Sequence, residues 1–282
     1  MSERERMRIG VNPTSIGVTP GWWLDAARRL EAAGYDGVYC WDHFTSRGRP
    51  ETPVLECWTT LAATAAVTTR MRVGSLVTNV MNRHPSVLAR MVANVVALAP
   101  GRVDVGIGVG GNAVEAAALG IEFPEIAERV ARLEEATAIL RALWSGGPVS
   151  YEGRWHRLTD AYASPAPQPP PRIIVGGESP AGARMAARAG DGWTTTGAAL
   201  PGLRSTYEEA LEAAGRRRAD VIVAVAVDLA RDAAPGADPL LADLRGEAER
   251  WRSLGADELI LNWVRVEQLP AVLAAAEAAA LA

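Results

Sequence analysis

Short runs of apolar residues alternate along almost the whole chain with longer stretches in which apolar residues recur every three or four positions. The short runs are typical of buried strands, whereas the longer stretches are typical of helices that bury one face. Regular alternation of the two is the pattern of βα units arranged around a parallel sheet. The chain therefore predicts an α/β fold made of repeated strand–helix units.

Eight strand–helix units account for this pattern, and eight is the number that closes a (βα)8 TIM barrel. Strands are predicted at residues 7–11, 37–41, 72–78, 102–109, 172–175, 191–194, 221–227 and 258–261. Helices are predicted at residues 21–33, 55–69, 85–98, 113–119, 124–144, 179–189, 203–214, 239–254 and 269–281. We predict a single barrel domain over residues 1–282, with a doubly wound open sheet as the alternative architecture.

The alternation breaks once, after the fourth unit. Two short runs at residues 149–151 and 155–158 flank residues 152–154, whose Glu-Gly-Arg sequence favours a hairpin turn. The proline-rich run at residues 165–171 then favours an extended connection, because proline fixes φ and cannot donate a backbone hydrogen bond. Since the alternation resumes at once, we predict a hairpin and proline-rich insertion between barrel units.

Composition excludes several partners and chemistries. The formal net charge of −4 argues against nucleic acid and anionic membranes as partners. The chain contains no lysine, which excludes Schiff-base catalysis and a lysine-dependent phosphate loop. Its two cysteines, Cys40 and Cys57, lie in apolar surroundings and are predicted to be buried thiols. No apolar stretch is long enough to span a bilayer, and residues 1–8 are charged, so we expect a cytoplasmic protein.

His43 is the candidate acid or base. In a (βα)8 barrel the catalytic groups follow the strands, and His43 directly follows the apolar run 38–41. Histidine exchanges a proton near neutral pH; the alternative is a histidine that only closes its loop by hydrogen bonding. Neighbouring Asp42 can hold the local backbone or contact a cofactor ring. His84 and His156 are expected to be structural or surface residues.

Two glycine-rich segments are candidate phosphate sites. Residues 176–179, Gly-Gly-Glu-Ser, join a predicted strand to a helix, whose free N–H groups favour an anion; Ser179 can equally be a simple helix cap. Residues 106–111 match G-x-G-x-x-G, but residues 128–133, where the acidic partner of a nicotinamide site belongs, are helical. A nicotinamide dinucleotide site is therefore the weaker alternative.

Metal-dependent and serine hydrolases fit the chain poorly. A catalytic metal needs several histidine and carboxylate ligands from strand ends, and His43 is the sole histidine in such a position. No metal site is therefore expected. The chain also lacks the G-x-S-x-G turn of serine hydrolases. The residues alone indicate an anion-binding barrel with one candidate acid or base.

Several segments between residues 8 and 195 are similar, in this order, to the luciferase-like monooxygenase family, also called the bacterial luciferase superfamily. The matching segments are Leu30–Val38 with Trp41–Phe44, Arg72–Asn79 with Arg83–Pro85, Gly101-Arg102 with Gly106–Gly110, Tyr151–Gly153, Pro171–Gly177 and Ala186–Trp193. The resemblance implies a (βα)8 barrel that binds FMN or the deazaflavin coenzyme F420, with the cofactor ring in the barrel mouth.

The resemblance also implies a set of site residues. Asp42 and His43 would lie beside the ring as the catalytic residues, with His43 as proton donor or acceptor. A bulge at Leu76 and Val77, often with a non-prolyl cis peptide in F420-dependent members, would support the back of the ring. The other implied cofactor contacts are Thr78, Gly108, Gly110, Asn112, Val175, Gly176, Gly177, Glu178 and Ser179.

The function that the resemblance implies is hydride transfer between coenzyme F420 and a small organic substrate, in a homodimer. The alternatives are an FMN-dependent monooxygenase, which uses O2 and flavin reduced by a separate reductase, and a cofactor-binding barrel without turnover. Sugar-phosphate dehydrogenases of the family carry an acid where this chain has Gly111, and they bind the phosphate with lysine; a different substrate is therefore expected. Trp193, Asn262 and Trp263 are candidate substrate contacts, with core packing as the alternative for the tryptophans.

Overall fold

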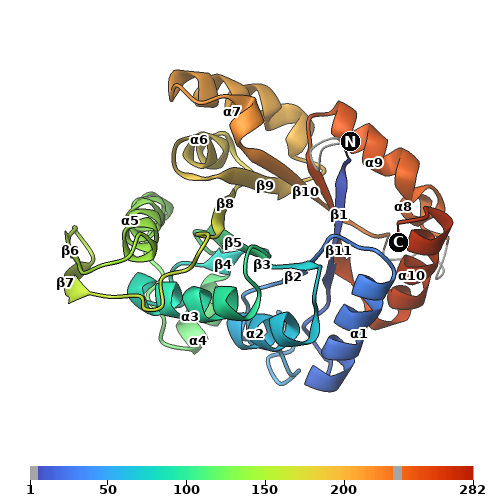
Figure 1. Ribbon diagram of the computed structural model, residues 1–282, viewed down its shortest axis with the longest axis horizontal. Coiled ribbons are helices and arrows are strands. Elements are labelled where there is room, and N and C mark those ends of the chain that lie inside the picture. Colours follow the sequence, from blue (N-terminus) through green and yellow to red (C-terminus); the bar gives the residue numbers. More distant parts are fainter. Residues whose placement is uncertain (1–5, 231–236, 282) are drawn as a thin grey trace.

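The computed structural model describes residues 6–230 and 237–281. Within these ranges, parallel strands form a closed barrel with helices around it, as Figure 1 shows. The barrel strands are β1 (Arg8–Pro13), β2 (Gly37–Cys40), β3 (Arg72–Ser75), β4 (Thr78–Asn79), β5 (Val103–Gly108), β8 (Arg172–Gly176), β9 (Gly192–Thr196), β10 (Ile222–Asp228) and β11 (Glu258–Val264). Because β3 and β4 both pair with β5, they share one position of the ring. The predicted (βα)8 barrel is confirmed.

Helices follow the strands, and their bounds lie close to those that the apolar periodicity predicts. They are α1 (Pro20–Ala32), α2 (Cys57–Val67), α3 (Pro85–Leu98), α4 (Ala113–Ala118), α5 (Ile126–Trp144), α6 (Pro180–Ala189), α7 (Leu200–Ala213), α8 (Pro239–Ala242), α9 (Leu244–Ser253) and α10 (Leu269–Ala278). The prediction of a single helix over residues 239–254 is wrong, because the structure has two helices there, α8 and α9. Asp243 has φ −142° and ψ 64°, and its carboxylate accepts from the Gly246 amide at 2.9 Å, so it ends α8 and caps α9.

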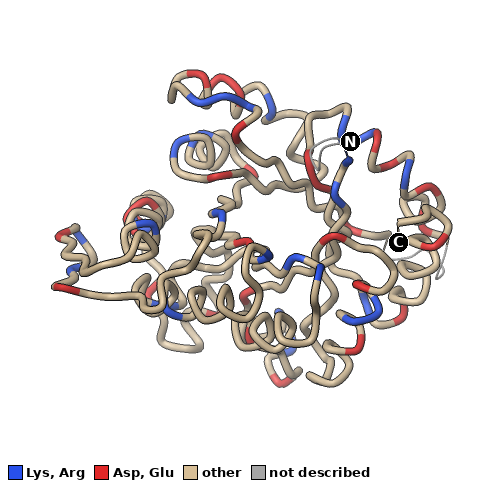
Figure 2. Tube along the Cα trace, in the orientation of Figure 1, with Lys and Arg blue, Asp and Glu red and all other residues tan. Residues whose placement is uncertain are grey.

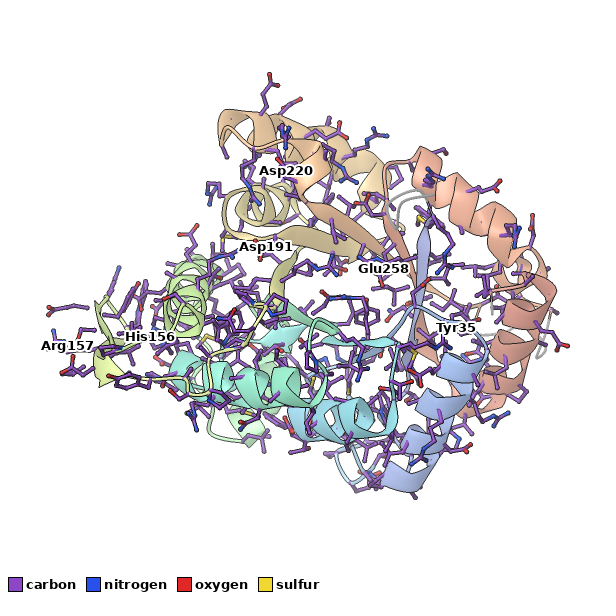
Figure 3. All side chains as sticks on the ribbon, viewed as in Figure 1. Tyr35, His156, Arg157, Asp191, Asp220 and Glu258 are labelled. Atoms are coloured by element: carbon purple, nitrogen blue, oxygen red, sulfur yellow. The ribbon has the colours of Figure 1, made fainter. Side chains whose placement is uncertain are left out.

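The predicted hairpin lies between α5 and β8. Its strands, β6 (Val149–Glu152) and β7 (Arg157–Ala161), are antiparallel and project to one side of the barrel (Figure 1). His156 lies 2.6 Å from the Glu135 carboxylate of α5, which anchors the hairpin. Figure 3 shows His156 and Arg157 far from Glu258 in the barrel. The hairpin histidine is therefore structural, as expected.

Charged residues at the starts of the strands close the bottom of the barrel. Arg8 pairs with Glu258 at 2.9 Å, and Arg72 forms two hydrogen bonds to Asp104, at 2.5 and 2.7 Å. Arg172 reaches the same carboxylate at 3.0 Å. Figure 2 shows charged positions on the barrel strands as well as along the outer helices. An ionic network, which the sequence analysis did not foresee, thus forms the floor of the barrel.

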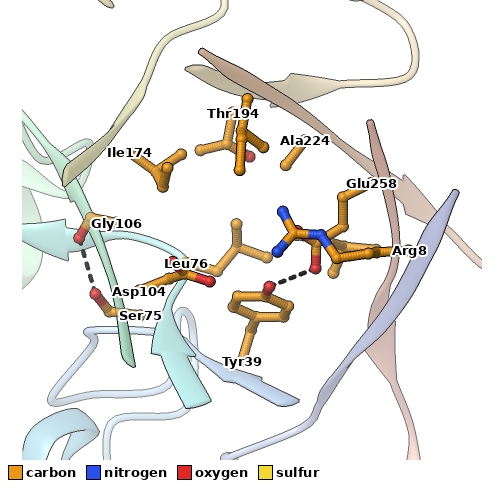
Figure 4. Close-up of a pocket in the computed structure, with 12 residues that line it drawn as sticks. Arg8, Tyr39, Ser75, Leu76, Asp104, Gly106, Ile174, Thr194, Ala224 and Glu258 are labelled. Carbon is orange, nitrogen blue, oxygen red and sulfur yellow. Dashed lines mark hydrogen bonds and ion pairs between the residues drawn. The ribbon is translucent and has the colours of Figure 1, made fainter. Parts of the chain in front are cut away.

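Above this floor the interior narrows to a small pocket, shown in Figure 4. The Tyr39 hydroxyl donates to Glu258, and the Ser75 hydroxyl donates to the Gly106 carbonyl at 2.8 Å. The apolar and small side chains that line the pocket include Leu76, Ile174, Thr194, Ala224 and Ile260. Alternate residues of a strand face the same side, so the next inward positions after this layer lie in the open mouth.

Two further expectations concern the described residues. Both cysteine thiols are buried, as predicted, with Cys40 and Cys57 each 0% exposed. Burial raises the pKa of the Cys57 thiol well above its ordinary value, with the adjacent Cys40 thiol adding to the rise. No helix in the described part of the chain is long and apolar enough to cross a membrane.

Candidate active site

The two sides of the barrel mouth differ in the size of their inward side chains. Strand alternation turns Asn12 on β1 and Asn262 on β11 into the mouth, and Trp41, which directly follows β2, continues the same alternation. On the opposite side, β5 and β8 present Gly108 and Gly176 at the same level. One wall is therefore polar and aromatic, and the other, the open wall, carries no side chains of its own at this level.

A bulge shapes the open wall. The Leu76–Val77 peptide, between β3 and β4, is cis, as the family resemblance implied. The Val77 side chain occupies the space that a Cβ would need at three glycines. A Cβ added at Gly106, Gly108 or Gly176 would lie 3.0, 2.8 or 3.0 Å, respectively, from the Val77 side chain. Close packing against this bulge therefore accounts for Gly106 and Gly108 of the G-x-G-x-x-G match, whereas a Cβ at Gly111 would meet nothing within 4 Å.

The segment after β8 forms a compact turn into α6. Ser179 caps the helix, because its hydroxyl accepts from the Gly182 amide at 3.2 Å. Gly177 packs directly on Gly182, where a Cβ at position 177 would lie 2.8 Å from the Gly182 Cα. Because α6 follows β8 directly, its first turn lies at the mouth end of the barrel. Pro180 has no N–H, and the Gly182 amide is already bonded to Ser179, so the anion predicted at residues 176–179 would meet the Ala181 amide in this turn.

His43 is held by a carboxylate that the sequence analysis missed. Its Nδ1 lies 2.8 Å from the Oε2 of Glu115 in α4, and its side chain is 39% exposed. The other oxygen of Glu115 accepts from the Phe44 amide and, at 2.9 Å, from the Thr45 amide. One buried carboxylate thus fixes both the imidazole and the backbone that follows it.

Glu115 is ionised in this arrangement. Burial opposes its charge, but the hydrogen bonds from His43, Phe44 and Thr45 outweigh burial and lower the pKa of its carboxyl. Asn112, which caps α4, also donates to Glu115 Oε2 at 3.3 Å. The spacing Asn-x-x-Glu resembles a capping box, and this was the sequence signal for Glu115. Asn112, a predicted cofactor contact, therefore has a clear structural role.

Asp42 lies beneath the same loop and is completely enclosed. Its two carboxylate oxygens bind the Arg83 guanidinium at 2.7 Å each, and its side chain is 0% exposed. The Asn79 amide donates to the same carboxylate at 2.9 Å. Arg83 also binds Glu56, the capping residue of α2. Of the two roles considered for Asp42, the geometry favours support of the backbone over contact with a ring.

Three other candidates face away from the mouth. Thr78 is 0% exposed and binds the Trp58 indole at 3.0 Å and the Ser75 hydroxyl at 2.9 Å. Val175 is likewise 0% exposed. Strand alternation turns both side chains outward, so the predicted cofactor contacts at Thr78 and Val175 would be made through their backbone. Trp193 is wrong as a substrate contact, since it stacks on Tyr207 of α7 with ring centroids 4.8 Å apart.

The remaining predicted contacts lie around the mouth. Gly110 has φ 74° and packs against Asn79, where a Cβ would lie 2.5 Å from the side-chain oxygen. Asn262 and Trp263 end β11, and the Trp263 ring lies 5.0 Å from that of Trp41. Among the described residues, no group of three or more histidine, cysteine and acidic side chains is arranged to hold a metal ion.

Comparison with known proteins identifies the family. The model of the luciferase-like monooxygenase family matches residues 7–249. The chain belongs to that family. A relative from Kineococcus radiotolerans, an F420-dependent glucose-6-phosphate dehydrogenase, is 34% identical over 239 residues, which cover 81% of this chain and 69% of the relative. The chain thus spans about two thirds of that relative's length.

Several solved structures have the same barrel fold as this chain. An F420-dependent secondary alcohol dehydrogenase in complex with an F420–acetone adduct superposes with a TM-score of 0.81 at 22% identity, over 95% of this chain and 99% of that one. Riboflavin lyase with modified FMN and riboflavin superposes with a TM-score of 0.78 at 16% identity, over 98% and 92%. At these identities the likeness extends to the barrel alone.

Proposed function

We propose that this luciferase-like protein is an F420-dependent oxidoreductase that transfers a hydride between the coenzyme and a small organic substrate. One observation carries the proposal: the exposed His43 imidazole, fixed by Glu115 at 2.8 Å, stands at a mouth whose opposite wall is glycine-lined. The F420-dependent relative at 34% identity supports the deazaflavin over FMN.

The residues present fit a flat cofactor with a phosphate group. Leu76 and Val77 would support the ring from behind, because the missing side chains at Gly108 and Gly176 let the Val77 side chain pack closely against β5 and β8. The turn at residues 176–179 and the first turn of α6 would hold the phosphate. When bound, the deazaflavin supplies the centre that accepts or donates the hydride.

His43 would handle the proton that accompanies the hydride. Because ionised Glu115 accepts the Nδ1 proton, the neutral imidazole keeps Nε2 as an acceptor. Nε2 can then take the proton from a substrate hydroxyl during oxidation, and the resulting imidazolium returns it during reduction. Glu115 stabilises the imidazolium in either direction, and Asp42 with Arg83 holds the loop in place.

The substrate would differ from that of the sugar-phosphate dehydrogenases. The chain has no lysine with which to bind a phosphate as those enzymes do, and Gly111 replaces their loop acid. A homodimer, which the resemblance implies, is part of the same proposal.

Anaerobic titration with F420 and, separately, FMN tests the cofactor. Saturable change in cofactor fluorescence with F420 alone is the expected result. Preference for FMN would favour the monooxygenase, with a separate reductase as partner, and binding of neither would overturn the cofactor assignment. His43→Ala should bind F420 unchanged yet lose about a hundredfold or more in turnover, the usual contribution of acid–base catalysis. Unchanged turnover would contradict the role of His43.

A further inference from the structure

A chain of three polar side chains crosses the wall of the mouth opposite the glycines. The Asn12 amide lies 2.8 Å from the Asn262 amide oxygen, and Asn262 Nδ2 donates to Asp228 Oδ1 at 2.6 Å. These residues end β1, β11 and β10, which are neighbours in the barrel. Asp228 Oδ2 accepts no hydrogen bond from any residue that the structure describes.

Asp228 lines a second pocket, which is distinct from the one inside the barrel. Asn262 and Trp263 line this pocket with Leu229 and Arg265. A row of rings leads from this pocket to His43. The centroid of the Trp263 ring lies 5.0 Å from that of Trp41, and the centroid of the Trp41 ring lies 6.0 Å from that of His43.

Among the residues that the structure describes, two carboxylates accompany one guanidinium at this pocket. Arg265 lies in its lining, and the Arg265 Nε binds Glu267 at 2.6 Å. Asp228 binds the neutral amide of Asn262 and forms no ion pair with any residue in the described ranges. The described lining therefore offers a carboxylate acceptor beside apolar and aromatic surface.

We propose that the pocket formed by Asp228, Leu229, Asn262, Trp263 and Arg265, the Asp228 pocket, is a substrate subsite for a group that donates hydrogen bonds and carries no negative charge. This inference rests on the proposed function, since His43 marks where the reacting hydroxyl or carbonyl lies. The substrate class is then an uncharged or cationic alcohol, or the matching carbonyl compound, with a second hydroxyl or an amino group. A carboxylate or phosphate at that end would be repelled by Asp228 and would leave its free oxygen unpaired.

A series of cyclohexanols that differ only on the opposite ring carbon tests the proposal. That carbon bears hydrogen, hydroxyl, ammonium or carboxylate, and dissociation constants are measured near pH 7.5 by ligand-observed NMR on the F420-loaded protein. We expect the ammonium and hydroxyl compounds to bind more tightly than plain cyclohexanol, and the carboxylate at least about tenfold more weakly than the ammonium compound.

Asp228→Asn keeps the size of the side chain and removes its charge. The preference for ammonium over carboxylate should fall below about threefold in this variant, and the matched surface variant Asp25→Asn should keep the native preference. The proposal is overturned if the carboxylate binds as tightly as the ammonium compound in the native protein, if no donor binds better than cyclohexanol, or if Asp228→Asn keeps the native order. Because F420 loading is measured first, failure to bind the coenzyme would overturn the proposed function, whereas a loaded protein without the charge order overturns this inference alone.

Discussion

At the scale of single residues, the proposed chemistry depends on the orientation of one imidazole. His43 is partly exposed, and rotation about its side chain would exchange the two ring nitrogens that meet the substrate. Glu115 prevents this by binding Nδ1, while it is itself held by the Phe44 and Thr45 amides. The partly exposed His43 imidazole is thus held by a buried neighbour.

We expect Glu115→Gln to lower kcat about tenfold to a hundredfold, because a hydrogen bond to a charged group contributes about 1.5–3 kcal/mol. The F420 dissociation constant should stay within about twofold of the native value, since Glu115 acts through His43. Steady-state kinetics across pH with a fluorescence titration measures both. Equal losses in kcat and in F420 affinity would instead indicate a collapsed loop.

The lowered pKa of Glu115 sets the sign of its contribution to stability. Its carboxyl ionises at lower pH in the folded chain than in the unfolded chain, so its interactions stabilise the fold above the unfolded value, about 4.3, and are lost as pH falls below it. Glu115 therefore stays ionised near neutral pH. A change of activity with pH in that range must come from the titration of another group.

A second prediction at this scale concerns the buried ion pair between Arg83 and Asp42. Removing one partner of a buried ion pair leaves the other charge buried without compensation, which costs about 3–5 kcal/mol. We expect Arg83→Met to lower the free energy of unfolding by that amount in urea denaturation, and Arg83→Lys to lose less, because it keeps the charge without the two-point contact. Equal stability of Arg83→Met and the native protein would show that the pair does not support the loop.

At the scale of elements, the turn from β8 into α6 is the clearest unit. Gly177 lets the turn lie against Gly182, and a Cβ there would be 2.8 Å from backbone, which a side-chain rotation cannot relieve. We expect Gly177→Ala to shift the first turn of α6 and to weaken F420 binding about tenfold or more, through lost hydrogen bonds to the phosphate.

Two comparisons isolate this effect. Gly202→Ala, in α7, adds a methyl group with nothing within 4 Å and should leave F420 affinity unchanged. A deazaflavin fragment that lacks the phosphate should bind native protein and Gly177→Ala alike. If Gly177→Ala weakens the fragment as much as the whole coenzyme, the phosphate does not bind at this turn.

At the scale of the whole molecule, the barrel separates a charged floor from a reactive mouth. Burial raises the pKa of Glu258; Arg8 opposes the rise, and the Asp104 carboxylate adds to it. A carboxyl with a raised folded pKa stabilises the fold below its unfolded value, and this contribution is lost as pH rises toward the folded pKa. The floor thus makes stability depend on pH through a residue remote from His43.

We expect native protein to lose stability relative to Glu258→Gln as pH rises above about 4.3, by at most about 1.4 kcal/mol per pH unit. Urea denaturation of both proteins between pH 4 and 8 measures the difference. The surface variant Asp25→Asn, at a position that pairs with Arg29 of the same helix, controls for net charge. A difference that is constant over this range would contradict a raised pKa.

Most of the architecture was predictable from local sequence patterns. Apolar runs and helical periodicity predicted the barrel strands and most helices, and Ser179 was recognised as a cap because a cap bonds to its own first turn. The break at Asp243 was missed because a helical pattern on both sides concealed it. Asp42 and His43 were found from their position after a strand, but their partners, Arg83 and Glu115, lie 41 and 72 residues away.

The sequence by itself determined the alternation of strands and helices, the loop that carries His43 and the glycines of the open wall, because each depends on a residue and its near neighbours. Only the tertiary structure decided which groups meet. Closure of the barrel brings Asn12, Asn262 and Asp228 together, joins Glu115 to His43, and gathers the strand-start charges into a floor. These contacts join strands and loops far apart in the chain, and their geometry follows from the register of the closed sheet, which no local pattern contains.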